Sequence, residues 1–215
     1  QKSGYQGMVE FIPGKYAHRP VDADGYMFIH CIFVGFKKAF KGMGYASSLI
    51  DECIKESIDK KMLGVSVVTR KGPFMAHNDI FLKKGFNIVD SVKPDFDLLV
   101  FKFNNQSKNP RFKQTLNESI NNFNQGLTIM RSAQCPYTEK NVNSMIETAE
   151  KLNLEAKIIE LSDASAAQNA PCAFGSFCLI YNGKLLSAHP ISNTRFENIM
   201  KKELTFSNNA RKARK

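Results

Sequence analysis

The stretch AFKGMGYASSLIDECI, residues 39–54, decides how the first half of this chain is expected to fold. Gly42 and Gly44 follow an apolar run and directly precede a pattern of apolar residues at helical spacing, which predicts a helix over residues 46–60. Glycines at the start of a helix let a ligand approach the backbone, and the N–H groups there attract anions. The stretch therefore predicts a turn suited to binding phosphate, with a plain strand-to-helix turn as the alternative.

The composition is that of a folded protein. The chain has 215 residues, of which 43% are hydrophobic and 23% charged, enough for one large or two small domains. Every apolar run is shorter than the roughly 18–20 residues that cross a bilayer, so we expect no membrane partner. Five cysteines at irregular spacing do not form a disulfide framework and favour a reducing cytoplasm.

The net charge of +10 can attract an anionic ligand such as a nucleotide cofactor, or can simply reflect scattered lysines. The sequence contains no nucleic-acid-binding motif, so nucleic acid is not an expected partner. It indicates no oligomeric state.

The patterns predict an α/β protein in two halves. In the first half, strands are expected at residues 8–12, 26–34, 63–69, 86–89 and 96–103, with helices at 46–60 and 78–84. In the second half, strands are expected at residues 127–131, 156–161, 177–181 and 184–188, with helices after residue 135, at 163–170 and at 195–204. The halves are separated by a polar segment, residues 104–126, with one weak helical pattern, and the chain ends in a basic tail, residues 205–215.

The phosphate-binding stretch resembles the Arg/Gln-x-x-Gly-x-Gly/Ala motif of GNAT acetyltransferases, with Lys41 in the Arg/Gln position, Gly44 as the central glycine and Ala46 as the last small residue. The sequence NDIFLKKGFNIVD, residues 78–90, resembles a second signature of the family, the helix and strand that flank the thiol end of acetyl-CoA. The resemblance covers about residues 8–103 and implies a GNAT-like mixed sheet with helices on its faces.

The resemblance also implies that acetyl-CoA is a co-substrate. Backbone groups of Phe33 and Val34 would bind its pantetheine arm, and Asn78 would lie near its thiol end. The pyrophosphate would be held by the backbone amides of the glycine loop, with Lys41 beside them: Gly42, Met43, Gly44, Tyr45 and Ala46.

This sequence departs from the family in two ways. Its first predicted strand begins at residue 8, so we expect that the usual opening strand and two helices, which wall the acceptor site, lie outside it. The tyrosine that protonates the leaving thiolate in many members is replaced by Leu82, which cannot donate a proton. Another residue or water would then do this work, or the chain binds acyl-CoA without catalysis.

Acyl transfer to an amine needs a base, because an ammonium group is not a nucleophile. His30 lies in the long predicted strand, Glu10 in the strand before it, and His77 just before the short helix. Each also has an ordinary interpretation: a core histidine, a solvent-facing strand residue and a loop residue. Strand alternation predicts that Cys31 faces away from His30. Arg19, in the loop before the long strand, could hold an acidic substrate or simply lie in solvent.

The second half places Cys135 between a predicted strand and a predicted helix, where the helix N–H groups favour a thiolate. The sequence CPYT resembles the Cys-Pro-Tyr-Cys of glutaredoxins, which implies a thioredoxin-like βαβαββα domain over residues 127–204. Thr138 replaces the second cysteine, so a two-thiol cycle at this motif is excluded and one-thiol chemistry remains. Cys135, Cys172, Cys178 and His189 lack paired Cys-x-x-Cys spacing, so no metal site is expected.

A GNAT-like half (residues 1–103) followed by a thioredoxin-like half resembles the YoaP-like acetyltransferases. The leading hypothesis is an acetyl-CoA-dependent N-acetyltransferase that acts on an amine of an unidentified small molecule or peptide. From the residues themselves, Glu10 or His30 is the candidate base and Cys135 a further candidate catalytic residue. The alternatives are a thiol or redox protein acting through Cys135 and a non-catalytic acyl-CoA sensor.

Overall fold

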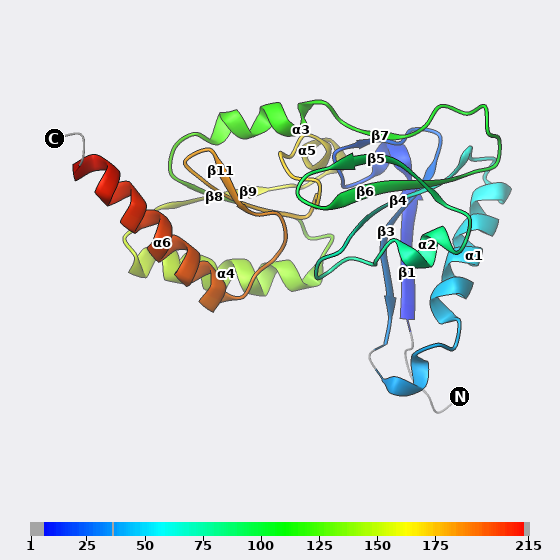
Figure 1. Cartoon of the computed structure of the whole chain (residues 1–215), viewed down its shortest axis with the longest axis horizontal. Helices are drawn as coiled ribbons and strands as arrows, with labels where there is room; N and C mark the ends of the chain where they lie inside the picture. Colours follow the sequence, from blue (N-terminus) through cyan, green and yellow to red (C-terminus); the bar gives the residue numbers. More distant parts are fainter. Residues whose placement is uncertain (1–6, 36, 213–215) are drawn as a thin grey trace. The chain divides into compact units, whose positions relative to one another are not determined.

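The computed structural model of the chain describes residues 7–35 and 37–212 (Figure 1). They form two compact units, Gln1–Gln114 and Thr115–Lys215, and each is described by itself. Both combine strands with helices, so the predicted α/β class is confirmed. None of the helices in the described ranges is long and apolar enough to span a bilayer.

The first unit is built mainly of strands, which alternate with two α-helices and two short 3-10 helices. Its strands are β1 (Gly7–Pro13), β2 (Val21–Asp22), β3 (Met27–Val34), β4 (Gly64–Arg70), β5 (Asn87–Val92), β6 (Phe96–Lys102) and β7 (Arg111–Phe112). Its helices are η1 (Gly14–Tyr16), η2 (Lys38–Phe40), α1 (Tyr45–Asp59) and α2 (Asp79–Leu82). The main elements are those predicted from the sequence, with ends displaced by a few residues.

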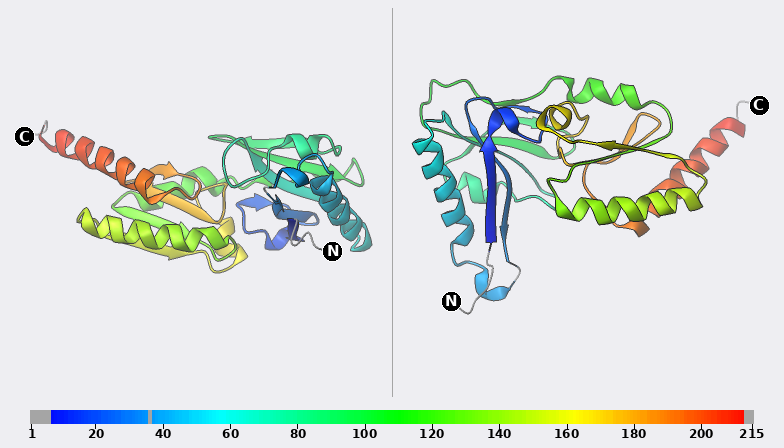
Figure 2. Two further views of the ribbon diagram at one scale, coloured as in Figure 1. Left: turned by 90° about the horizontal axis from the view of Figure 1, so that it is seen from below. Right: turned by 180° about the vertical axis from the view of Figure 1, so that it is seen from behind.

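The central sheet of the first unit has the order β1-β3-β4-β6-β5. Only β3 and β4 run parallel, because α1 connects them by a crossover; the other neighbours are antiparallel. The sheet is therefore mixed, as predicted. Helix α1 packs against β1, β3 and β4, and the view from behind shows it running beside these strands (Figure 2).

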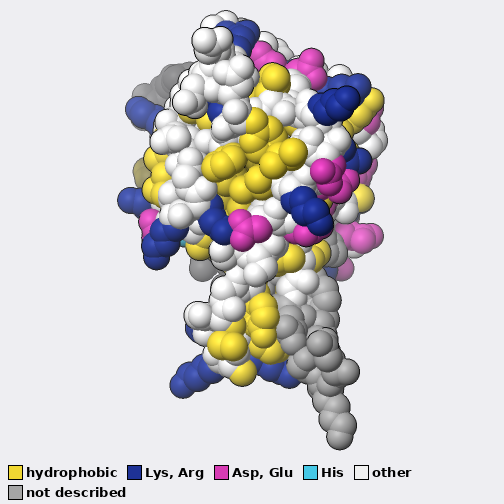
Figure 3. Space-filling view, turned by 90° about the vertical axis from the view of Figure 1, so that its right-hand side faces the viewer, with side chains coloured by type: hydrophobic (Ala, Val, Ile, Leu, Met, Phe, Trp, Pro, Cys, Tyr) yellow, Lys and Arg dark blue, Asp and Glu magenta, His cyan; other side chains and the backbone are white. Residues whose placement is uncertain are grey.

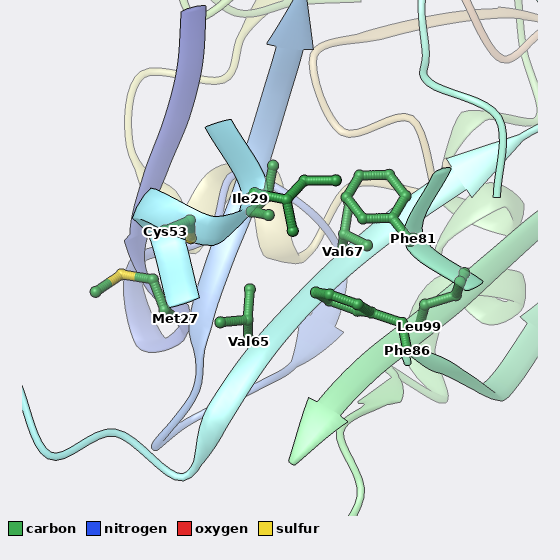
Figure 4. Close-up of a cluster of buried hydrophobic side chains, with 9 residues drawn as sticks. Met27, Ile29, Cys53, Val65, Val67, Phe81, Phe86 and Leu99 are labelled. Carbon is green, nitrogen blue, oxygen red and sulfur yellow. The ribbon is translucent and has the colours of Figure 1, made fainter. Parts of the chain in front are cut away.

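The α1 face of the sheet carries the main core of this unit. Ile50 and Cys53 of α1 belong to one cluster with alternate residues of β3 and β4 and one residue of β6, and α2 adds Phe81. Figure 4 shows Cys53 and Phe81 among these strand residues. The core residues, all buried, are Met27, Ile29, Ile50, Cys53, Val65, Val67, Phe81, Phe86 and Leu99. This core fixes α1, and with it the glycine loop that begins the helix.

The loop after β1 and the segment after β6 fold together within the first unit. Val21 of β2 pairs with Phe112 of β7, and the Tyr26 hydroxyl donates to the Lys108 carbonyl at 2.7 Å. Residues 111–112, which the sequence assigns to the polar segment 104–126, thus form a strand of their own. This pairing joins segments some 90 residues apart, so no local pattern predicts it.

The second unit is one sheet with helices. Its strands are β8 (Leu127–Arg131), β9 (Ala156–Glu160), β10 (Phe177–Tyr181) and β11 (Lys184–Ser187). Its helices are α3 (Thr115–Glu118), η3 (Ser119–Phe123), α4 (Pro136–Lys151), α5 (Ala164–Gln168) and α6 (Asn193–Lys212). The sheet has the order β11-β10-β8-β9, with β8 and β9 parallel and the remaining pairs antiparallel.

Two details of the second unit bear on the sequence predictions. Asn182 and Gly183 both take positive φ angles, 48° and 76°, as the predicted tight hairpin turn requires. Helix α6 runs on to Lys212, so the prediction that the helix ends at residue 204 is wrong. The sequence after Leu204 contains no glycine or proline to end the helix.

Candidate functional site

The glycine loop at the start of α1 leaves its backbone open. Gly42 and Gly44 have φ angles of 74° and 78°, in the left-handed region that favours glycine. A Cβ added at either glycine would have no other described atom within 4 Å. Gly44 is the N-cap of α1, and its carbonyl accepts from Ser48 N–H at 2.9 Å. The N–H groups of the first turn of α1 have no carbonyl partner within the helix, so they can bind an anion.

Lysines surround this loop. Lys37, Lys38 and Lys41 are exposed and form no ion pair with any other described residue. The sequence has no acidic residue between Asp24 and Asp51. Figure 3 shows Lys and Arg side chains at the lower end of this unit, where η2 lies. The loop is therefore a positively charged site with accessible backbone donors.

Strands β3 and β4 separate before they end. Their pairing covers only Met27, Phe28 and Ile29 of β3, opposite residues 65–67 of β4, although β3 continues to Val34. The outer part of β3 still pairs with β1, where Phe33 lies opposite Met8 and Val34 opposite Gly7. Beyond Ile29, no described residue of β3 is paired with β4. Backbone groups of a strand that has left its neighbour can bind an extended ligand.

A β-bulge lies where β3 leaves β4. Glu10 is opposite Cys31, whereas the next residue of β1, Phe11, is opposite Ile29, so His30 is the extra residue of β3. Opposed residues share a face of the sheet, and His30 Nδ1 lies 3.5 Å from Glu10 Oε1. Glu10, His30 and Cys31 therefore gather on one face. The prediction that Cys31 faces away from His30 is wrong, because the bulge interrupts the alternation.

The imidazole of His30 has a partner at each nitrogen. Nε2 accepts a hydrogen bond of 2.8 Å from the backbone N–H of His18, and Nδ1 faces Glu10. The His30 side chain is 3% exposed and that of Glu10 41%. Burial lowers the pKa of His30 below its ordinary value of 6.5, and the hydrogen bond with Glu10 opposes this shift. His30 is therefore neutral at pH 7.

Arg19 does not lie in solvent. It is 4% exposed, and its guanidinium donates to the carbonyl of His30 at 3.4 Å. Its positive charge further lowers the pKa of His30. Arg19 thus packs against the backbone of the bulge. The sequence indicated neither this role nor the contact of the His18 N–H with His30. Both depend on how the loop before β3 folds back on that strand.

The predicted residues around α2 lie at its N-terminus. The Asn78 amide donates to Asp97 of β6 at 3.2 Å, and His77 Nδ1 lies 2.9 Å from Asp79 in an exposed ion pair. Leu82 is 40% exposed at the end of the helix. The N-cap of α2 is therefore tied by a hydrogen bond to β6, a strand of the same sheet as the bulge.

In the second unit, Cys135 is the N-cap of α4 and is partly exposed. The hydroxyl of Thr138 is buried and has no hydrogen-bond partner among the described residues. The N–H of Ser132 donates to the carbonyl of Ser176 at 3.0 Å, which ties the loop before Cys135 to the residue before β10. The thiol therefore lies at the end of the sheet from which α4 begins.

The other two cysteines of this unit are buried. Cys172 and Cys178 are 2% and 1% exposed, and the Cys172 thiol donates to the Ala188 carbonyl at 3.3 Å. Burial raises the pKa of the Cys178 thiol, and the neighbouring Cys172 thiol raises it further. Neither is placed to react with a solvent-borne partner.

Comparisons with known proteins support the predicted resemblance. Residues 156–198 match the family described as YoaP-like. The chain is 29% identical over 195 residues to the uncharacterized N-acetyltransferase YoaP of Bacillus subtilis (strain 168), covering 89% of this chain and 76% of that protein. The crystal structure of Ard1 from Thermoplasma volcanium is a weaker likeness, with a TM-score of 0.33 and 20% identity over 45% of this chain. The match spans 62% of the Ard1 chain, less than two thirds of its length.

Proposed function

We propose that this chain is an N-acetyltransferase that moves an acetyl group from acetyl-CoA to an amine of a small molecule or peptide. The observation that carries the proposal is that three features follow one another along the chain: the Glu10–His30 pair at the bulge, the part of β3 that has left β4, and the cationic glycine loop. Similarity to a protein named as an N-acetyltransferase supports it.

In this proposal, acetyl-CoA would lie along β3, with its phosphates at the glycine loop and its thioester toward the bulge. The amides of residues 42–46 and Lys41 would bind the pyrophosphate, as the open space before Gly42 and Gly44 allows. Backbone groups of Phe33 and Val34, in the part of β3 that has left β4, would bind the pantetheine arm, with Asn78 near the thiol end. The thioester would then lie near the bulge, which carries Glu10 and His30.

The reaction needs an amine without its extra proton. The Glu10–His30 pair would take that proton, the amine nitrogen would attack the thioester carbonyl, and the thiolate would leave as the C–S bond breaks. Leu82 cannot protonate the thiolate, so we expect a proton from water. An ordinary thiol has a pKa of about 8.5, so its thiolate is a weak enough base to leave without a side chain that protonates it.

The test is release of free thiol from acetyl-CoA, measured with a panel of small amines and peptide N-termini. We expect release that depends on the amine and acetylated product of matching amount. Binding of acetyl-CoA without release across a broad panel would contradict the proposal and favour an acyl-CoA sensor.

A second function is favoured by the order of the second sheet. The parallel pair β8–β9, the antiparallel β10 and β11, and a cysteine at the start of α4 agree with a thioredoxin-like module. We propose that this module performs one-thiol chemistry through Cys135 in the cytoplasm, which its free cysteines fit. Mixed-disulfide formation with a small disulfide tests it; reactivity that persists in Cys135→Ser would contradict it.

A further inference from the structure

We propose that Glu10 takes the proton of the acceptor amine, directly or through one water, and that His30 is a positioning residue that does not act as the base. This inference rests on the proposed acyl transfer. It assigns the step to one of two residues that the sequence left as alternatives.

The contacts of His30 determine which nitrogen carries its proton. Nε2 accepts from the backbone N–H of His18 at 2.8 Å, so it must be unprotonated. A neutral imidazole carries one proton, which therefore lies on Nδ1 and points toward Glu10 Oε1, 3.5 Å away. The lone pair of Nε2 is thus occupied, and Nδ1 has none to offer. An incoming amine would have to displace the loop before His30 could accept its proton.

The surroundings of His30 also oppose a second proton. The groups that face it are Glu10 from β1, and His18 and Arg19 from the loop after η1. Protonated Nε2 would direct its N–H at the N–H of His18, and the His30 side chain is 3% exposed. Burial and the charge of Arg19 both lower the pKa of His30. Among these described groups, Glu10 alone stabilises the cation.

Glu10 has the properties that His30 lacks. Its side chain is 41% exposed, so an acceptor can reach it, and a carboxylate is ionised at neutral pH. The ammonium group would pass one proton to a Glu10 oxygen, and the resulting amine would attack the thioester carbonyl. As the C–S bond breaks, the thiolate takes a proton from water. The new amide gives its remaining extra proton to the hydroxide so formed, and Glu10 returns its own proton to solvent. The Nδ1–H of His30 would orient the carboxylate throughout.

Two variants separate the roles. Glu10→Gln removes the base and should lower kcat/KM by about 100-fold or more. In His30→Gln, the amide oxygen can accept from His18 N–H and the amide N–H can donate to Glu10, so kcat/KM should fall by no more than about tenfold, with the acidic limb of its pH profile retained. Unchanged acetyl-CoA affinity in both variants is the control for folding. A larger loss in His30→Gln than in Glu10→Gln, or loss of the acidic limb only in His30→Gln, would overturn the inference.

A second measurement does not need turnover. A ¹⁵N–¹H correlation spectrum of the imidazole groups, with His30→Gln for assignment, should show His30 protonated at Nδ1 only, from pH 8 down to pH 6.5. A proton on Nε2 in this range would overturn the inference even if the protein were active. Failure of the unmodified protein to release thiol would instead count against acyl transfer itself. The spectrum would then establish only which nitrogen of His30 carries the proton.

Discussion

Gly14 lies directly against the backbone of Ala23: a Cβ added at Gly14 would come within 2.0 Å of the Ala23 carbonyl oxygen. The N–H of Gly14 also donates to the Tyr26 carbonyl at 2.7 Å. These contacts close the loop between β1 and β3. The closed loop holds His18 against the imidazole of His30.

We therefore expect Gly14→Ala to destabilise the first unit. The methyl group meets backbone atoms that cannot rotate away, so the free energy of unfolding should fall by at least about 1–3 kcal/mol. Urea denaturation measures the change. Lys15→Ala, next to it and exposed, should stay within about 0.5 kcal/mol of the unmodified protein. Equal stability of Gly14→Ala and Lys15→Ala would contradict this expectation, because it would show that the loop rearranges at little cost to accommodate the added methyl group.

Gly44→Ala should separate binding from stability. Its Cβ enters open space, so the cost to stability is the left-handed backbone alone, about 1 kcal/mol. The same Cβ would project where the phosphates are proposed to lie, and acetyl-CoA affinity measured by calorimetry should fall about tenfold or more. Gly126→Ala is the matched control, because Gly126 also has a positive φ and open space but lies in the second unit. Equal affinities of the two variants would argue against phosphate binding at the loop.

The stability of the protein should depend on His30 in mildly acidic solution. Its folded pKa lies below the ordinary value of 6.5, so the unfolded chain binds a proton first as pH falls. Folding favours the neutral form of His30, and this contribution to stability is fully present above pH 6.5. The free energy of unfolding should therefore decrease as pH falls through 6.5 toward the pKa of His30 in the folded protein. Denaturation curves between pH 7.5 and 5.5 should show this loss, and His30→Gln should reduce it. Identical pH dependence in both proteins would mean that His30 keeps its ordinary pKa.

Thiol alkylation of the folded protein should be selective. Burial raises the pKa of Cys53 to about 12 and also raises that of Cys178, and Cys172 is buried as well. Cys31 and Cys135 are partly exposed. With iodoacetamide at pH 8, mass spectrometry should find label on Cys135 and Cys31 well before the other three. Label on Cys53 under native conditions would show that α1 opens locally.

Features fixed by local chemistry could be predicted from the sequence. The turn at Asn182-Gly183, the left-handed glycines 42 and 44, and the amphipathic α1 each depend on residues within a few positions of one another. The α/β class followed from the same patterns. The two units also follow the composition change, although the described boundary lies between Gln114 and Thr115.

The features that were missed depend on pairing between distant segments. The bulge at His30 shows only in the register of β1 against β3, so alternation alone put Cys31 on the wrong face. The pairing of β2 with β7 and the contact between His18 and His30 likewise need the folded loop. Glu10 and His30 were both singled out from their chemistry, but their 3.5 Å contact came only from the structure.

Helix α2 offers the sharpest contrast between neighbouring residues. Phe81 is fully buried, with its ring 5.4 Å from that of Phe86, whereas Leu82 is 40% exposed. Phe81→Ala leaves a cavity in the core beneath the sheet and should lower the free energy of unfolding by about 3–5 kcal/mol. Leu82→Ala should change it by no more than about 0.5 kcal/mol. Because α2 has only one turn, its position depends on Phe81, and we also expect Phe81→Ala to weaken acetyl-CoA binding near Asn78 while Leu82→Ala does not. Equal effects of the two truncations on stability would contradict the described packing of this helix.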